Sequence, residues 1–107
     1  MMPEFVLIQW TTDNLEEARG ISKSLLEKKL IACASIIPLT ESLYIWENQI
    51  ESSQEIKIVM KTRFEHYPKV ESLIKKMHSY ELPEILATPI LEGSKEYLNY
   101  MTDVTNV

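Results

Sequence analysis

The hydrophobic positions along this chain change their spacing several times, and each spacing predicts a different element. Residues 5–11 (Phe-Val-Leu-Ile-Gln-Trp-Thr) form a nearly continuous apolar run, which is typical of a strand buried on both faces. The following positions recur close to helical spacing and predict a helix over residues 14–29, with Asp13 and Glu16 in a capping box. These positions are Leu15, Ala18, Ser22, Leu25 and Leu26.

Residues 31–63 have the pattern of one long β-hairpin with its tip near residues 44–50. Both arms are rich in β-branched and aromatic residues, which suit a pleated surface. Asn48 is the predicted tip residue because asparagine tolerates a positive φ. Pro38 cannot donate to a ladder and predicts a bend or a sheet edge in the first arm, and we expect a bulge at residues 52–55 in the return arm. Because such a hairpin extends beyond one small domain, a second copy of the chain is its expected support.

A second helix is predicted to begin near Phe64, with Pro68 tolerated in its first turn. Its apolar positions recur at i, i+3, i+4 and i+7, which predicts a stripe facing the core. These positions are Val70, Leu73, Ile74 and Met77.

After a connection at residues 78–84, residues 84–90 predict a last core strand. Ser94 is the predicted cap of a final helix, whose apolar side is formed by Tyr97, Leu98 and Met101. We expect the tail after Asp103 to fray.

The predicted order is β-α-β-β-α-β followed by a helix, within a single domain spanning residues 1–107. Connection rules favour an α+β, ferredoxin-like fold, in which two helices cover one face of a four-stranded antiparallel sheet. Apolar residues nevertheless point to both faces, as Leu7 and Ile8 do on the first strand and Ile58 and Val59 do on another. An uncovered apolar face would be sticky, so the pattern predicts self-association.

Composition narrows the function classes. The net charge of −5 argues against a nucleic-acid binder, which needs a basic patch. The single cysteine, Cys33, excludes an intramolecular disulfide and suits either a reducing compartment or indifference to redox conditions. We see no signal-peptide pattern and no apolar run of about 20 residues that could span a bilayer. The expected location is therefore the cytoplasm, without a membrane partner.

Few residues are candidates for chemistry. Cys33 is either a soft metal ligand or, as its alanine neighbours favour, a small buried filler. His78 is either a metal ligand or proton carrier, or a histidine that ends the second helix and is stabilised by the helix dipole. His66 has no partner at ligand spacing and is predicted to lie on the surface.

A second group of polar residues falls at the ends of the predicted elements: Lys61, Tyr80, Glu81 and Glu84. With His78 these residues form either a cleft holding an acid and a base or ordinary ion pairs and turns. The chain has no phosphate loop and no nucleophile elbow, so we expect no enzyme activity. Tyr44 and Trp46 near the hairpin tip are either a ligand platform or, more in keeping with an overhanging hairpin, part of an oligomer interface.

In this order, five motifs resemble the CutA family of divalent-cation-tolerance proteins over nearly the whole chain. They are Leu30-Ile-Ala-Cys-Ala-Ser-Ile-Ile-Pro38, Ser42-Leu-Tyr-Ile-Trp-Glu47 with Ile50-Glu51, Met60-Lys-Thr-Arg63, His78-Ser-Tyr-Glu-Leu-Pro-Glu84, and Pro89-Ile90 with Glu92-Gly93 and Tyr97-Leu98. The resemblance implies a homotrimer, with hairpins and edge strands joining sheets across subunits. It also implies a link to tolerance of copper and other divalent metals, without an obligatory cofactor.

The resemblance assigns roles to particular residues. Cys33 and His78 match positions tied to metal binding, and Lys61, Tyr80 and Glu84 match positions around an inter-subunit cleft. The chain departs from the family pattern in three places. Asn48 stands where the family usually has glycine, Ser79 replaces the usual proline, and Met77 stands where some members carry a second histidine.

Two functions follow from the resemblance. The first is a trimeric protein that binds copper or another divalent metal ion in the response to metal ions. The alternative is a small-molecule-sensing or signalling trimer, similar in architecture to the nitrogen-regulatory signal-transduction proteins, whose cleft binds an anionic or polar ligand.

Overall fold

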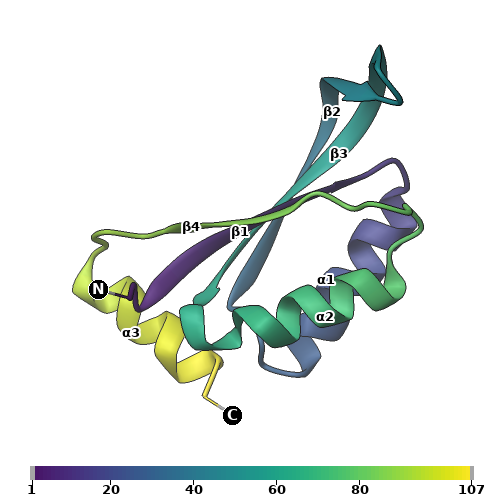
Figure 1. Cartoon of the computed structure of the whole chain (residues 1–107). Helices are drawn as coiled ribbons and strands as arrows, with labels where there is room; N and C mark the ends of the chain where they lie inside the picture. The colour runs from purple at the N-terminus through teal and green to yellow at the C-terminus, as the bar shows by residue number, and fades with distance from the viewer. Residues whose placement is uncertain (1, 107) are drawn as a thin grey trace.

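The structure, a computed structural model, describes residues 2–106 and contains one four-stranded antiparallel sheet with three α-helices (Figure 1). The sheet order is β2–β3–β1–β4. The strands are β1 (Phe5–Thr12), β2 (Cys33–Trp46), β3 (Gln49–Arg63) and β4 (Ile85–Pro89). The helices are α1 (Leu15–Glu27), α2 (Tyr67–Met77), which follows a 3₁₀ turn at Phe64–His66, and α3 (Lys95–Val104). This is the α+β, ferredoxin-like arrangement predicted from the sequence.

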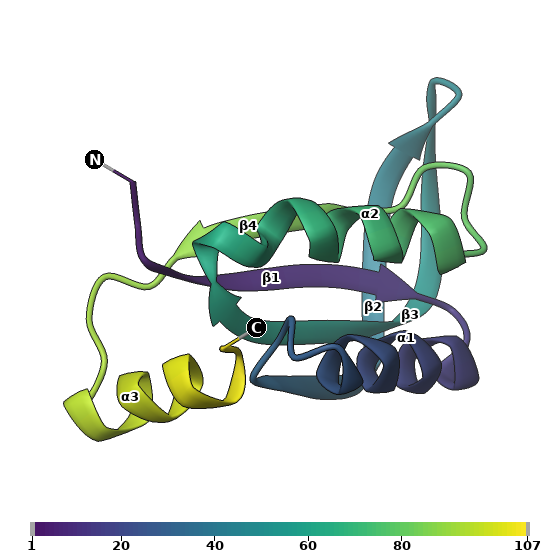
Figure 2. The ribbon, with the colours of Figure 1, turned by 90° about the horizontal axis from the view of Figure 1, so that it is seen from below.

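The main core lies between the sheet and the pair α1 and α2, which run along one face of it (Figure 2). Val6, Ile8 and Trp10 alternate along β1 and are fully buried against these helices. From the helices, Leu25 and Ile74 pack into the same cluster. Among residues 2–106, no helix combines the length and the apolar character that crossing a bilayer requires.

The opposite face of the sheet is less apolar than the sequence argument assumed. The register places Leu7 opposite Lys61 and Gln9 opposite Val59, so lysine alternates with valine there. One end of this face is covered within the chain, because α3 brings Met101 against Phe5. The expectation of apolar residues on both faces is therefore confirmed for β1, but β3 carries charge on its second face.

The β2–β3 hairpin extends beyond the rest of the chain (Figure 1). Its tip is a two-residue turn in which Glu47 (φ 50°) and Asn48 (φ 63°) both have positive φ, as in type I′ turns. The predicted role of Asn48 is confirmed. The register shift lies between Ile37 and Thr40 in the first arm, where Leu39 has φ 61°, and the bulge expected at residues 52–55 is wrong.

Helix α1 begins one residue later than the predicted capping box. Asn14 is the N-cap, and its side chain accepts a hydrogen bond from the Glu17 backbone N–H at 3.0 Å. Ile21 belongs to the buried face, whereas Leu15 and Leu26 are exposed. Asparagine and aspartate are equally good caps, so sequence alone did not choose between neighbouring positions.

Three other expectations fail for tertiary reasons: the core position of Met77, the surface position of His66 and the fraying of the tail after Asp103. Met77 is 45% exposed because the buried face of α2 ends at Ile74. His66 is not a surface residue but only 5% exposed, with its Nε2 atom 2.9 Å from the Thr105 carbonyl oxygen. Thr105 is fully buried, so the chain is held at least that far, and Arg63 also donates to its carbonyl at 2.7 Å.

Candidate functional site

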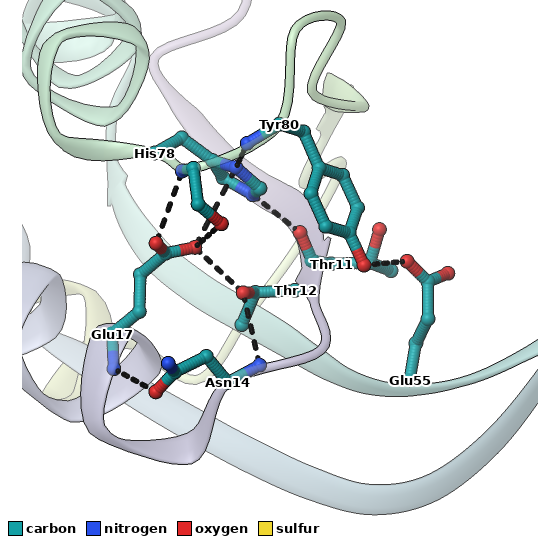
Figure 3. Close-up of polar contacts among 8 residues, drawn as sticks. Thr11, Thr12, Asn14, Glu17, Glu55, His78 and Tyr80 are labelled. Atoms are coloured by element: carbon teal, nitrogen blue, oxygen red, sulfur yellow. Dashed lines mark hydrogen bonds and ion pairs between the residues drawn. The ribbon is translucent and has the colours of Figure 1, made fainter.

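The connection between α2 and β4 begins at His78, which caps the C-terminal end of α2 (Figure 3). The His78 side chain is fully buried. Its Nε2 atom lies 2.6 Å from the Thr11 carbonyl oxygen, and its Nδ1 atom accepts from the Tyr80 backbone N–H at 2.9 Å. The ring meets Trp10 and Tyr80 edge to face, at centroid distances of 5.7 and 4.6 Å.

Glu17 on α1 holds Ser79, the residue after His78, through hydrogen bonds. Its carboxylate accepts from the Ser79 backbone N–H at 3.0 Å and from the Ser79 hydroxyl at 3.3 Å. It also accepts from the Thr12 hydroxyl at 2.6 Å, at the end of β1 (Figure 3). A proline at position 79 would have no N–H to donate, so the serine is what allows Glu17 to hold this backbone position.

Tyr80 in turn reaches the hairpin. Its hydroxyl donates to Glu55 Oε2 at 2.7 Å, and Glu55 is only 7% exposed (Figure 3). Burial raises the pKa of the Tyr80 phenol above its usual value of 10, and the hydrogen bond and negative charge of Glu55 raise it further. The pair is therefore a neutral phenol that donates to a carboxylate.

A groove of about 900 Å³ lies between the hairpin and the α2–β4 connection. Tyr80 and Glu84 both line it, and Gln9 donates to Glu84 at 3.1 Å. The cleft between subunits that the resemblance implies stays a prediction. Its charged lining is one lysine, Lys57, and four carboxylates. The carboxylates are those of Glu41, Glu55, Glu81 and Glu84. The groove is thus acidic and suits a cationic or uncharged polar ligand better than an anion.

Aromatic side chains form another part of the groove lining. Tyr44 and Trp46 lie there on the first arm of the hairpin, both partly exposed.

Cys33 and Lys61 lie elsewhere. They are directly paired across β2 and β3, and Lys61 is paired with Leu7 of β1, four residues from Thr11. At 3.3 Å per residue that separation is about 13 Å along the strand. Within one chain, the structure therefore does not bring Cys33 to His78, and Lys61 is not part of the groove lining that includes Tyr80 and Glu84.

Cys33 has its own neighbours on the second face of the sheet. The Tyr97 hydroxyl lies 3.9 Å from Cys33 Sγ, and Lys61 Nζ lies 5.5 Å from the centre of the Tyr97 ring. Burial raises the pKa of the Tyr97 phenol and the contact with Cys33 raises it further, while Lys61 opposes both. In the single chain, Cys33 is half-buried.

No group of three or more His, Cys, Asp or Glu side chains within residues 2–106 is arranged to hold a metal ion. Sequence reasoning also missed two residues that shape the site. Glu17 adjoins the predicted capping box of Asp13 and Glu16 and was given no role of its own, and Glu55 fell in the predicted bulge. Glu17 contacts Ser79, which is 62 positions away in the sequence, and Glu55 contacts Tyr80, which is 25 positions away. No local pattern signals either contact.

Comparison with known proteins gives the family. The model of the CutA1 divalent ion tolerance protein family matches residues 6–104. A divalent-cation tolerance protein CutA of Thermus thermophilus is 40% identical over 104 residues, covering 97% of this chain and 99% of that protein. A divalent-cation tolerance protein CutA of Archaeoglobus fulgidus is 44% identical over 102 residues, covering 95% of this chain and 97% of that protein.

Solved structures agree. CutA1 from Shewanella sp. SIB1 superposes with a TM-score of 0.95 at 38% identity, over the full length of both chains. CutA from Archaeoglobus fulgidus gives a TM-score of 0.92 at 42% identity, covering 95% of this chain and 99% of that one. That protein is described as periplasmic, and the cytoplasmic location expected for the present chain stays a prediction. On these matches, the chain belongs to the CutA1 family of divalent ion tolerance proteins.

Proposed function

We propose that this protein serves tolerance of divalent cations as a non-catalytic homotrimer. The observation that carries the proposal is the apolar surface of the projecting hairpin. Four of its aliphatic side chains are each at least 70% exposed in the single chain: Leu39, Leu43, Ile45 and Ile50. Apolar side chains gathered on one exposed element mark an interaction surface, and identical copies are its simplest occupants. The number three comes from the family resemblance.

The metal ion is proposed to be copper or another divalent ion, bound between subunits. A single chain offers no cluster of three ligands within residues 2–106, so protein ligands would have to come from more than one copy. The half-buried Cys33 thiol is the soft donor best suited to copper. Self-association can hold without the metal, because it depends on the exposed hairpin residues and not on Cys33, whereas a metal site between subunits requires self-association.

The experiment for self-association is sedimentation equilibrium of the untagged protein. The wild type is expected at three subunit masses, and Ile45→Ser with Ile50→Ser is expected to lower the mass. Leu26→Ser is the matched control, because Leu26 is also exposed but lies on α1, away from the hairpin. A wild type that sediments as a stable single subunit would refute the homotrimer.

Equilibrium dialysis against copper tests the metal. Cys33→Ser is expected to lower the copper bound per chain, while its mass stays that of the wild type. Unchanged copper uptake in Cys33→Ser would remove the thiol as a ligand.

The groove favours a second candidate, a small-molecule-sensing trimer. Its volume of about 900 Å³ is within the range of sites that hold small organic ligands. A thermal-shift screen should find a stabiliser among amines and polar metabolites rather than among nucleotides, and Glu84→Gln should weaken its effect. A panel without any stabiliser would count against this candidate.

A further inference from the structure

Both ring nitrogens of His78 are already in use. The backbone N–H of Tyr80 can only donate, so Nδ1, 2.9 Å away, must be the unprotonated acceptor. The carbonyl oxygen of Thr11 can only accept, so Nε2, 2.6 Å away, must carry the proton. The ring is therefore the neutral Nε2–H tautomer, and its only lone pair points at Tyr80.

This arrangement does not fit a metal ligand. A metal ion needs an imidazole lone pair, and here it would have to displace the Tyr80 amide from Nδ1. The side chain is fully buried, so an ion could not approach without opening the connection. Within residues 2–106, the carboxylate within 4 Å of Nδ1 is that of Glu17, whose oxygens already accept hydrogen bonds from Thr12 and Ser79.

We propose that His78 is a positioning residue that sets Tyr80 against Glu55 in the wall of the groove, and that it binds no metal. Three consecutive residues are each tied to a different element. His78 is tied to β1 through Thr11, Ser79 to α1 through Glu17, and Tyr80 to β3 through Glu55 (Figure 3). Because Nδ1 holds the Tyr80 amide and the two rings meet at 61°, His78 fixes both the backbone and the ring of Tyr80.

An effect of His78 on ligand binding would rest on the groove being the small-molecule site proposed above. The role of His78 in positioning Tyr80 does not depend on that proposal. The direct test uses the wild-type protein labelled with ¹⁵N at histidine, and Zn²⁺ as a diamagnetic probe. The resonance that disappears in His78→Asn identifies the ring. We expect a protonated Nε2 and an unprotonated Nδ1, with neither resonance moving as Zn²⁺ is added. A Nδ1 resonance that shifts and saturates with Zn²⁺ would overturn the proposal.

Two variants test the positioning role through the ionisation of Tyr80, followed by ¹³C NMR of its Cζ atom and assigned with Tyr80→Phe. In His78→Ala the Tyr80 phenol loses its alignment with Glu55, so its apparent pKa should fall by about one unit or more. In His78→Asn the side-chain oxygen can replace Nδ1 as acceptor, so most of the elevation should remain. A folded His78→Ala with unchanged Tyr80 ionisation would overturn the role, and so would a His78→Asn that behaves like alanine.

If His78→Ala does not fold, His78→Asn and the Zn²⁺ titration still decide the matter. Failure of this inference is also distinguishable from failure of the proposed function. The sedimentation mass and copper uptake depend on the hairpin and Cys33, and neither measurement involves the His78 ring.

Discussion

Replacing Glu17 by alanine should release the α2–β4 connection from α1. The Glu17 carboxylate accepts from the Thr12 hydroxyl at 2.6 Å and from two groups of Ser79 at 3.0 and 3.3 Å. Thr12 is fully buried, so its hydroxyl would lose a charged acceptor that water cannot readily replace. Ser79 is exposed, and water can take over its bonds.

The magnitude follows from these two environments. A hydrogen bond to a charged acceptor is worth about 1.5–3 kcal/mol, and the two Ser79 bonds, which water replaces, together contribute about 0.5–1 kcal/mol. Glu17→Ala should therefore lower the free energy of unfolding by about 2–4 kcal/mol. Glu16→Ala is the matched control in the same helical turn, because Glu16 is exposed and has only a 3.8 Å ion pair with Arg19. It should lose less than about 0.5 kcal/mol.

The assay is guanidinium chloride unfolding followed by circular dichroism. All variants must be compared at one protein concentration, since self-association makes apparent stability concentration-dependent. Both substitutions remove one first-turn carboxylate, so their helix-dipole losses are similar and cancel in the comparison. Equal unfolding midpoints for Glu17→Ala and Glu16→Ala would refute the reasoning, because they would show that the contacts of Glu17 contribute nothing beyond its charge.

Three further predictions concern other parts of the chain. The Tyr80 pKa is raised in the folded state, so its stabilising contribution should be complete below pH 10 and decline as the pH rises further. Tyr80→Phe should therefore lose less stability than the wild type over that range. Urea unfolding at a series of alkaline pH values tests this, and parallel stability curves for the two proteins would contradict it. Asn48→Val should cost about 1–3 kcal/mol because a β-branched residue resists φ 63°, whereas Asn48→Gly should be nearly neutral; equal thermal midpoints for both would refute a positive-φ requirement. Met101→Ala should lower the free energy of unfolding by about 2–5 kcal/mol, because it leaves a cavity in the cluster with Phe5 and Ala32. Met77→Ala should cost little because Met77 is exposed. Chemical unfolding that ranks the two variants in the reverse order would contradict this.

Much of the fold could be predicted because its signals are local. The apolar run at residues 5–11, the helical stripe from Val70 to Ile74 and the cap at Ser94 are each signals within a few residues, and they are realised in β1, α2 and α3. The stripe was predicted to continue to Met77, which is exposed. The turn at Asn48 is similar, since backbone sterics at one or two positions select its conformation. The same reasoning failed by one residue at the α1 cap, where two good capping residues stand side by side.

The candidate site could be predicted only in part. Tyr80 and Glu84 line one groove of the single chain, and the lysine in its lining is Lys57, not Lys61. A place for Lys61 in a cleft between subunits stays a prediction. Lys57 and Lys61 share a face of β3 but lie four residues apart, so choosing between them required the register with β1.

By itself, the sequence determined the order of elements, the antiparallel α+β architecture and the family, because hydrophobic period, turn residues and motif spacing are properties of short segments. Only the tertiary structure decided that His66 and Thr105 are buried together, that Glu17 holds Ser79, and that both nitrogens of His78 are occupied. These contacts join residues up to 67 positions apart. Whether a polar group is a free ligand or a satisfied partner depends on which distant donor or acceptor the folded chain brings within 3 Å, and no local pattern encodes that distance.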